Sequence, residues 1–129
     1  MSITIQATQG LFSDEAEKDI VRGVTESILE ANQAQGNELA LHHPIVTLLK
    51  LPASDTSAGA GRAPSVVVSV HSRIASLDTD DKREKFVTAM TDLMEKAAEG
   101  RLERDRIYVS LLYGDMWGIG GKLYRNTDL

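Results

Sequence analysis

Apolar residues alternate with polar ones at the start of the chain and then take up helical spacing. Ile3, Ile5 and Ala7 alternate with Thr and Gln, which is the period of a half-buried strand. Ser13 can accept a hydrogen bond from the first turn of a following helix, and the acidic residues directly after it suit the positive end of the helix dipole. Glycine and asparagine at 36–37 lie just past the predicted helix end. The apolar positions of this helix are Ile20, Val21, Val24 and Ile28.

Two further strands flank a segment of different composition. Residues 45–51 are mostly apolar or β-branched and stop at Pro52, so we expect a strand there. The segment 53–64 is rich in Ala, Ser, Gly, Thr and Asp, which is the composition of a loop. Residues 65–70 include four valines, enough β-branching for a strand that is buried on both faces.

The same order of elements then repeats. Residues 78–81 open a second helix, 106–113 form a fourth strand, and a glycine-rich tail leads to a short apolar end around Leu123 and Tyr124. The two helices superimpose at an offset of 66 residues, which pairs Ile20 with Phe86. The apolar positions of the second helix are Phe86, Val87, Met90, Met94 and Ala97.

These elements predict an α+β fold in which two consecutive β-α-β units form a four-stranded mixed sheet backed by two helices. Each unit is a right-handed crossover between parallel strands, and both helices have one apolar face, so both cover one side of the sheet. The strand at 65–70 is too hydrophobic to face water on its other side, so we expect other subunits to cover it. We interpret residues 1–129 as a single domain with a pseudo-repeat (1–52 and 65–113), a loop (53–64) and a C-terminal tail (114–129).

The composition changes this picture mainly by exclusion. The chain has no cysteine, which excludes disulfides, a thiol nucleophile and thiolate metal sites. A net charge of -5 makes nucleic acid a poor partner, because phosphate-binding surfaces are normally basic. We find neither the pattern of a signal peptide nor the roughly 18 consecutive apolar residues of a membrane span. We therefore expect a cytoplasmic protein without a membrane partner.

Three short segments match a known family in their order along the chain. They are residues 10–15 (Gly-Leu-Phe-Ser-Asp-Glu) before the first helix, 105–109 (Asp-Arg-Ile-Tyr-Val) at the last strand, and 115–121 (Asp-Met-Trp-Gly-Ile-Gly-Gly) in the tail. Together they resemble the tautomerase superfamily, and most of all its malonate semialdehyde decarboxylase and macrophage migration inhibitory factor branches. The resemblance implies a homotrimer whose three sheets form a central barrel, with a pocket at each subunit boundary.

The N-terminus departs from this family. Family enzymes use an N-terminal proline, exposed by methionine removal, as base or acid, whereas the second residue here is Ser2. If Met1 is removed, the α-amine of Ser2 can act as a modest general base near neutral pH. A retained Met1 would instead occupy the space of the proline amine. The alternative is an N-terminus that merely starts a strand.

The end of the third strand matches a segment that lines the family pocket. In the decarboxylase-like branch an arginine at this place binds the substrate carboxylate, a role that suits Arg73 because a guanidinium grips a carboxylate with two hydrogen bonds. His71 could tune such a site, or it is a satisfied structural group. The alternative for Arg73 is a surface ion pair with Asp78, Asp80 or Asp81.

Further pocket positions carry over from the resemblance one at a time. Tyr108 matches a tyrosine that closes the pocket from a neighbouring subunit, although Ser110 stands where the inhibitory-factor branch often has asparagine. Trp117 and Ile119 resemble the aromatic and apolar wall of the decarboxylase branch, and Trp117 could equally anchor trimer packing. Lys50 could contact an anion in the pocket or protect a strand edge from aggregation.

Other chemistry finds little support in the sequence. The decarboxylase branch activates water with an aspartate after the first helix, and only Glu38 lies near that place. Residues 118–122 lack the spacing and the Ser/Thr of a phosphate loop. His42 and His43 have no partner at metal-ligand spacing, so we expect no metal site and no cofactor.

Two functions follow from these observations. The first is a tautomerase-type isomerase without the N-terminal proline, whose activity on a small carboxylated substrate is weak or absent. The alternative is a non-catalytic homotrimer that binds a small anion or serves as a structural protein on the same scaffold.

Overall fold

A computed structural model of the 129-residue chain describes residues 1–37, 44–55, 64–73, 77–114 and 116–125. The helices are α1 (Asp14–Ala31) and α3 (Asp80–Ala97), with short 3-10 turns at η1 (Ala53–Asp55) and η2 (Arg104–Arg106). The strands are β1 (Ser2–Thr8), β2 (Ile45–Leu51), β3 (Val66–Arg73), β4 (Ile107–Gly114), β5 (Met116–Ile119) and β6 (Lys122–Arg125).

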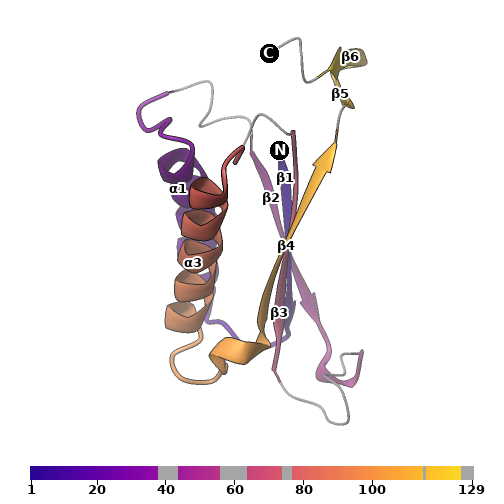
Figure 1. Cartoon of the computed structure of the whole chain (residues 1–129). Helices are drawn as coiled ribbons and strands as arrows, with labels where there is room; N and C mark the ends of the chain where they lie inside the picture. Colours follow the sequence, from indigo (N-terminus) through magenta and orange to yellow (C-terminus); the bar gives the residue numbers. More distant parts are fainter. Residues whose placement is uncertain (38–43, 56–63, 74–76, 115, 126–129) are drawn as a thin grey trace.

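Four strands form one mixed sheet in the order β2-β1-β3-β4. The outer pairs, β1 with β2 and β3 with β4, are parallel, and the central pair of β1 and β3 is antiparallel. Each parallel pair is joined through one helix, and the two helices lie side by side (Figure 1). The predicted fold of two β-α-β units with a four-stranded mixed sheet is therefore confirmed.

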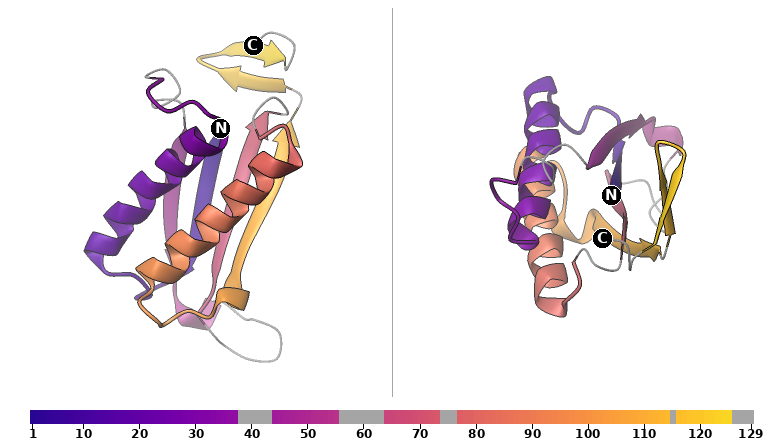
Figure 2. Two further views of the ribbon diagram at one scale, coloured as in Figure 1. Left: turned by 60° about the vertical axis from the view of Figure 1, so that its left-hand side comes forward. Right: turned by 90° about the horizontal axis from the view of Figure 1, so that it is seen from above.

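Both helices cover the same face of this sheet, and the hydrophobic core lies between the two layers (Figure 2). Removing these side chains from water supplies most of the folding free energy. Fully buried residues come from both central strands and both helices; they are Ile3, Ile5, Val66, Val68, Val70, Ile20, Val24, Phe86, Met90 and Met94.

The helices begin and end on defined capping interactions. The hydroxyl of Ser13 accepts from the Ala16 N–H at 3.1 Å, as predicted, and the hydroxyl of Thr79 accepts from the Lys82 N–H at 3.2 Å. The predicted end of the first helix near residue 36 is wrong, because α1 ends at Ala31.

The early end of α1 has a clear local cause. Gln33 takes a left-handed φ of 55°, and the Ala34 N–H returns to the Leu29 carbonyl at 2.7 Å while the Gln33 N–H bonds to Glu30. This pair of hydrogen bonds is a Schellman motif, which closes a helix. Glutamine is an uncommon residue for it, so the helix end could not be predicted at this position.

The C-terminal tail contains more structure than the sequence predicted. Strands β5 and β6 pair as an antiparallel hairpin, in which Ile119 faces Lys122. The turn residues Gly120 and Gly121 have φ values of 59° and 80°, and positive φ at both central positions is what a tight type I′ turn requires. The hairpin lies beyond the end of the four-stranded sheet, away from the helices (Figures 1 and 2).

The sheet face opposite the helices is open in the single chain. Its exposed large apolar side chains are on the two outer strands: Ile45 (67% exposed), Leu49 (41%), Tyr108 (57%) and Leu112 (48%). On this face β3 contributes the half-buried Val67, while its other valines are buried under the helices. Among the described residues, no helix is long and apolar enough to cross a membrane.

Candidate functional site

Three chain segments meet at the end of the sheet where β1 begins. Ser2 is the first residue of β1 and pairs with Ile45 on one side and with His71 of β3 on the other. Arg73 is two residues beyond His71 and pairs with Gly114, the last residue of β4. The hairpin of β5 and β6 follows directly after β4 (Figure 1). The antiparallel pairing of β1 and β3 thus brings the predicted residues Ser2, His71 and Arg73 to one place.

Met1 is itself part of the folded structure. Its side chain packs against the hydrophobic core, and its carbonyl accepts a hydrogen bond from the Ile45 N–H at 3.1 Å. While Met1 is present, the nitrogen of Ser2 is a peptide amide, which donates a hydrogen bond and has no lone pair available as a base. Amine chemistry at Ser2 therefore requires that Met1 is removed.

Tyr108 and Lys50 lie toward the opposite end of the same sheet. Tyr108 is on the strand rung of Gln6 and Lys50 is on the rung of Ala7. Four residues of extended chain separate Gln6 from Ser2, about 13 Å along the strand. One subunit therefore does not bring Tyr108 or Lys50 to the start of β1. The expectation for Tyr108, which places it in the pocket of a neighbouring subunit, stays a prediction.

Lys50 has a partner at its own end of the molecule. It lies on the edge strand β2, and its Nζ is 3.4 Å from a carboxylate oxygen of Glu17 on α1. A charged side chain on an edge strand discourages edge-to-edge pairing. Both roles that the sequence left open for Lys50, an anion contact and protection of the strand edge, stay predictions.

The three aspartates that could pair with Arg73 each have a basic partner on α3, three or four residues further along the chain. Because these contacts are local to the start of α3, the acidic run neutralises itself. The hydrogen bond and the charge of Lys82 hold the pKa of Asp78 below its ordinary value. The ion pairs are Asp78 with Lys82 at 2.8 Å, Asp80 with Arg83 at 3.0 Å and Asp81 with Lys85 at 3.7 Å.

Some predicted positions lie outside what the structure describes. Glu38, His42 and His43 are outside the described residues. The backbones of Arg73, Trp117 and Ile119 are placed in β3 and β5, and their side chains are outside the description. Within the described part of the chain, no three His, Asp or Glu side chains are grouped to hold a metal ion.

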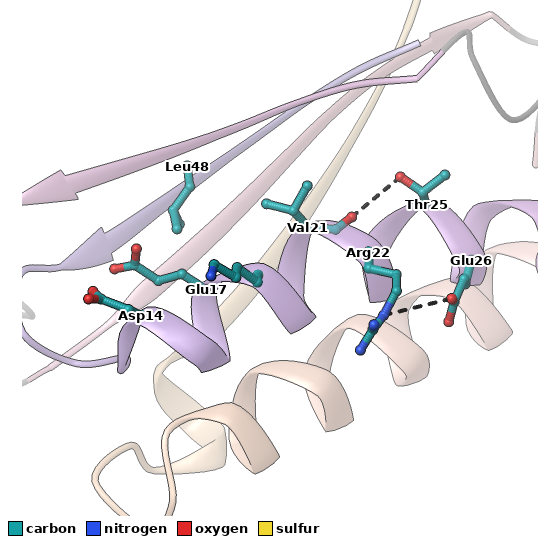
Figure 3. Close-up of a pocket in the computed structure, with 8 residues that line it drawn as sticks. Asp14, Glu17, Val21, Arg22, Thr25, Glu26 and Leu48 are labelled. Atoms are coloured by element: carbon teal, nitrogen blue, oxygen red, sulfur yellow. Dashed lines mark hydrogen bonds and ion pairs between the residues drawn. The ribbon is translucent and has the colours of Figure 1, made fainter.

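A groove of about 870 Å³ runs along α1 beside the edge strand β2 (Figure 3). Val21 and Leu48 provide its apolar surface, and charged residues of α1 form its rim. Arg22 pairs with Asp19 at 2.7 Å and with Glu26 at 4.0 Å, so the charge of Arg22 is balanced within the helix. The sequence placed the lining residues in the first helix and in the strand at 45–51 and gave no indication that they form a groove. The groove contains none of the predicted site residues. Its lining is Asp14, Glu17, Lys18, Val21, Arg22, Thr25, Glu26 and Leu48.

Comparison with known proteins identifies the fold. No family model and no curated protein sequence matches the chain. A fused 4-OT symmetric trimer is 12% identical with a TM-score of 0.80, covering 99% of this chain and 98% of that one. The macrophage migration inhibitory factor of Toxoplasma gondii is 13% identical with a TM-score of 0.76, covering 96% of this chain and 100% of that one.

A third solved structure represents the decarboxylase branch. The FG41 malonate semialdehyde decarboxylase, inhibited by 3-bromopropiolate, is 17% identical with a TM-score of 0.65, covering 88% of this chain and 83% of that one. At such low identity the likeness concerns the backbone and leaves the activity open. The resemblance to the family in the sequence thus agrees with the likeness of the backbone to solved structures of this fold. This chain has the fold of the tautomerase superfamily.

Proposed function

We propose that the chain forms a homotrimer that binds small carboxylates at the start of β1, with keto–enol tautomerase activity that is weak or absent. The observation that carries this proposal is the register at that end of the sheet. Ser2 faces His71, and Arg73 follows two residues later in the same strand. A potential α-amine, an imidazole and a guanidinium are thereby attached to neighbouring strand ends, and a guanidinium binds a carboxylate well.

The open sheet face supports the trimer. Apolar side chains of β2 and β4 are exposed there, and a second copy of the chain would remove them from water. A two-stranded hairpin is marginally stable by itself, so β5 and β6 also favour a neighbouring subunit as support. The fused 4-OT neighbour is a symmetric trimer.

The proposed residue roles follow the geometry and the resemblance. Arg73 anchors the carboxylate, and the exposed His71 beside Ser2 tunes the site. Trp117 and Ile119 form its apolar wall, and Tyr108 of a neighbouring subunit closes it. The substrate class is supported by the decarboxylase neighbour, because its inhibitor 3-bromopropiolate is itself a small carboxylate. We assign Lys50 to the strand edge and place the protein, as one domain, in the cytoplasm.

Any chemistry depends on the first two residues. With Met1 removed, the Ser2 amine would take a proton from the carbon next to the keto carbonyl, as a general base, and the resulting ammonium would give that proton to the enolate oxygen, as a general acid, which forms the enol and restores the amine. The contacts of Met1 favour the second function, a binding or structural trimer without catalysis, because they fill this place with a side chain and an amide.

Two measurements separate these functions. The intact mass of the natively expressed protein shows whether Met1 is retained, and retention would leave only the non-catalytic function. The second measurement is enol–keto conversion of phenylpyruvate by the parent, Ser2→Pro, Arg73→Ala and the control Arg101→Ala. Arg101 bonds to the Ala98 carbonyl, away from the site.

Each pattern of activity has one meaning. Parent activity that is lost in Arg73→Ala and kept in Arg101→Ala supports the weak isomerase. Activity that appears only in Ser2→Pro supports a binding trimer that has lost its catalytic residue. An inert parent together with an inert Ser2→Pro variant overturns the tautomerase interpretation of the site.

A further inference from the structure

Leu77 has an unusual backbone conformation for its residue type. Its φ is 51° and its side chain is fully buried. The left-handed region is unfavourable for a branched side chain, and such residues persist only where surrounding contacts hold them. Leu77 lies between β3 and α3, and its burial in the core holds the chain against the helix layer at this point.

Side chains from two other parts of the chain bond directly to the backbone of Leu77, and a third bonds to one of those side chains. The N–H of Leu77 donates to the side-chain oxygen of Asn32, the residue that follows the end of α1, at 2.9 Å. Its carbonyl accepts from the hydroxyl of Tyr113 on β4 at 3.4 Å. That hydroxyl in turn accepts from the Arg83 Nε of α3 at 3.0 Å. Both polar groups of the Leu77 peptide backbone therefore have partners from other elements.

Arg83 joins this cluster by two further contacts. Its guanidinium lies 5.2 Å from the centre of the Tyr113 ring, within the range of a cation–π contact. Its second hydrogen bond goes to Asp80 at 3.0 Å. The bonds to Tyr113 and Asp80 raise the pKa of Arg83 above its ordinary value, so the group stays charged throughout the physiological range. We call Arg83, Tyr113, Leu77 and Asn32 the exit clamp.

The exit clamp lies where two segments with predicted site residues leave the sheet. Tyr113 pairs with Ser72, and the next residue, Gly114, pairs with Arg73. The chain from β3 passes Arg73 and reaches Leu77 four residues later, while the chain from β4 leaves Gly114 for the hairpin that holds Trp117 and Ile119. The Tyr113 side chain thus bonds to the segment that leaves β3, while the Tyr113 backbone is the penultimate residue of β4, from which the hairpin continues.

We infer that Arg83 and Tyr113 are positioning residues, which hold the carboxylate-binding end of β3 and the hairpin of β5 and β6 in a fixed relation. The role in binding rests on the proposed function, whereas the coupling of the two exits is a property of the fold. Neither residue touches the substrate in this inference. Loosening the clamp should release both exits together, because each depends on the same hydroxyl and guanidinium.

The test compares Tyr113→Phe and Arg83→Lys with a matched control. Tyr113→Phe removes the shared hydroxyl and keeps the ring, and Arg83→Lys keeps the charge and removes the planar fork. The control is Arg104→Lys, since Arg104 also bonds to an α3 carboxylate, Asp92 at 2.8 Å, but lies at the other end of the helix. Native-state hydrogen exchange, read separately at 70–78 and at 113–125, reports each exit.

The exchange experiment has a defined result. Both clamp variants should exchange about tenfold faster at both segments, which corresponds to the loss of about 1.4 kcal/mol of hydrogen bonding. The core helices should keep their protection, and Arg104→Lys should match the parent. Acrylamide quenching of Trp117, the single tryptophan, should rise about twofold in the clamp variants. Faster exchange at one segment only, at neither, or equally in Arg104→Lys overturns the inference.

Calorimetric titration with phenylacetate, a carboxylate without a keto group, connects the clamp to the site. The clamp variants should bind it about fivefold more weakly than the parent and Arg104→Lys. Unchanged affinity despite faster exchange overturns the positioning role. If the parent binds no phenylacetate while both exits respond together, the proposed binding function fails and the coupling of the exits stands.

Discussion

The two ends of the four-stranded sheet have the same plan and different side chains. At each end one central strand begins beside the end of the other, because β1 and β3 run antiparallel. At one end the start of β1 meets His71 and Arg73. At the opposite end, β1 finishes at Thr8, whose hydroxyl accepts from the Ser65 N–H at 3.1 Å.

This difference explains why we propose a site at only one end of the sheet. The Thr8 end is closed by hydrogen bonds within the chain, and Lys50 beside it pairs with Glu17. The Ser2 end instead has an exposed imidazole, the N-terminal residues and two chain exits held by the exit clamp. The proposed site therefore depends on a few side chains at the strand ends and not on the fold itself.

The largest expected effect comes from breaking the core that both ends share. Phe86 is fully buried between the layers, so Phe86→Ala should lower the free energy of unfolding by about 3–5 kcal/mol. Urea unfolding followed by circular dichroism measures this change. Val87→Ala, at the adjacent half-buried position, should change it by less than about 1.5 kcal/mol. Equal losses in the two variants would contradict the assigned core.

A charge placed on the open sheet face, at either end of the sheet, should prevent assembly of the trimer. Leu112 is on the strand rung of His71, and Leu49 is on the rung of Gln6. Leu112→Asp and Leu49→Asp would each bury a carboxylate between subunits, which costs about 2 kcal/mol or more per subunit. Light scattering should then find monomers where the parent is a trimer.

The control for the open face adds the same charge to the helix layer. Thr88→Asp lies on an exposed part of α3 and should remain a trimer. A parent protein that is monomeric in dilute solution, or a trimer that survives both leucine substitutions, would exclude the open sheet face as the assembly surface.

The helix caps offer a matched pair, one from each β-α-β unit. Ser13 caps α1 near the Thr8 end, and Thr79 caps α3 near the Ser2 end. Ser13→Ala and Thr79→Ala should each lower the free energy of unfolding by about 1 kcal/mol, because each leaves one helix N–H without its side-chain acceptor. Chemical denaturation gives both values.

The two cap variants should differ in their effect on hydrogen exchange near the Ser2 end. Thr79 follows Leu77 by two residues, so Thr79→Ala should also speed hydrogen exchange at 70–78, while Ser13→Ala should leave that segment unchanged. If both caps affect the segment equally, the two ends of the sheet are not independent in stability.

The elements of this fold could be predicted because each leaves a periodic signal. Alternation in β1, helical spacing in α1 and α3, and the repeated order of elements were enough for the two β-α-β units. Ser13 was predictable as a cap since a hydroxyl precedes two carboxylates. The hairpin was missed because four-residue strands are too short to establish a period, although Gly120 and Gly121 carry its turn signal.

The candidate site was only partly predictable for a different reason. His71 and Arg73 are polar residues at a strand end, but their closeness to Ser2 follows from the antiparallel pairing of β1 and β3, which no local pattern contains. Tyr113 and Arg83 are 30 residues apart, and Leu77 gives no sign in the sequence of its left-handed φ. Contacts between distant segments of ordinary composition required the structure.

The smallest expected effect is the change of stability at acidic pH that comes from Asp78, near the Ser2 end of the sheet. Asp78 is exposed, and the hydrogen bond from Lys82 lowers its pKa from the ordinary value of 3.8. A carboxyl whose pKa is lower in the folded state stabilises that state above its unfolded pKa, and this contribution disappears as the pH falls through the folded value. Because solvent screens the pair, we expect a small change.

The prediction is a difference between two pH profiles. Lys82→Ala should lower the melting temperature slightly at pH 6, and the two proteins should converge as the pH falls below 3.8, the ordinary pKa of Asp78. Lys85→Ala removes the longer pair of Lys85 with Asp81 at 3.7 Å and should follow the parent more closely at every pH. A Lys82→Ala profile parallel to that of the parent would mean that the Asp78 pair does not contribute to folding at this end of the sheet.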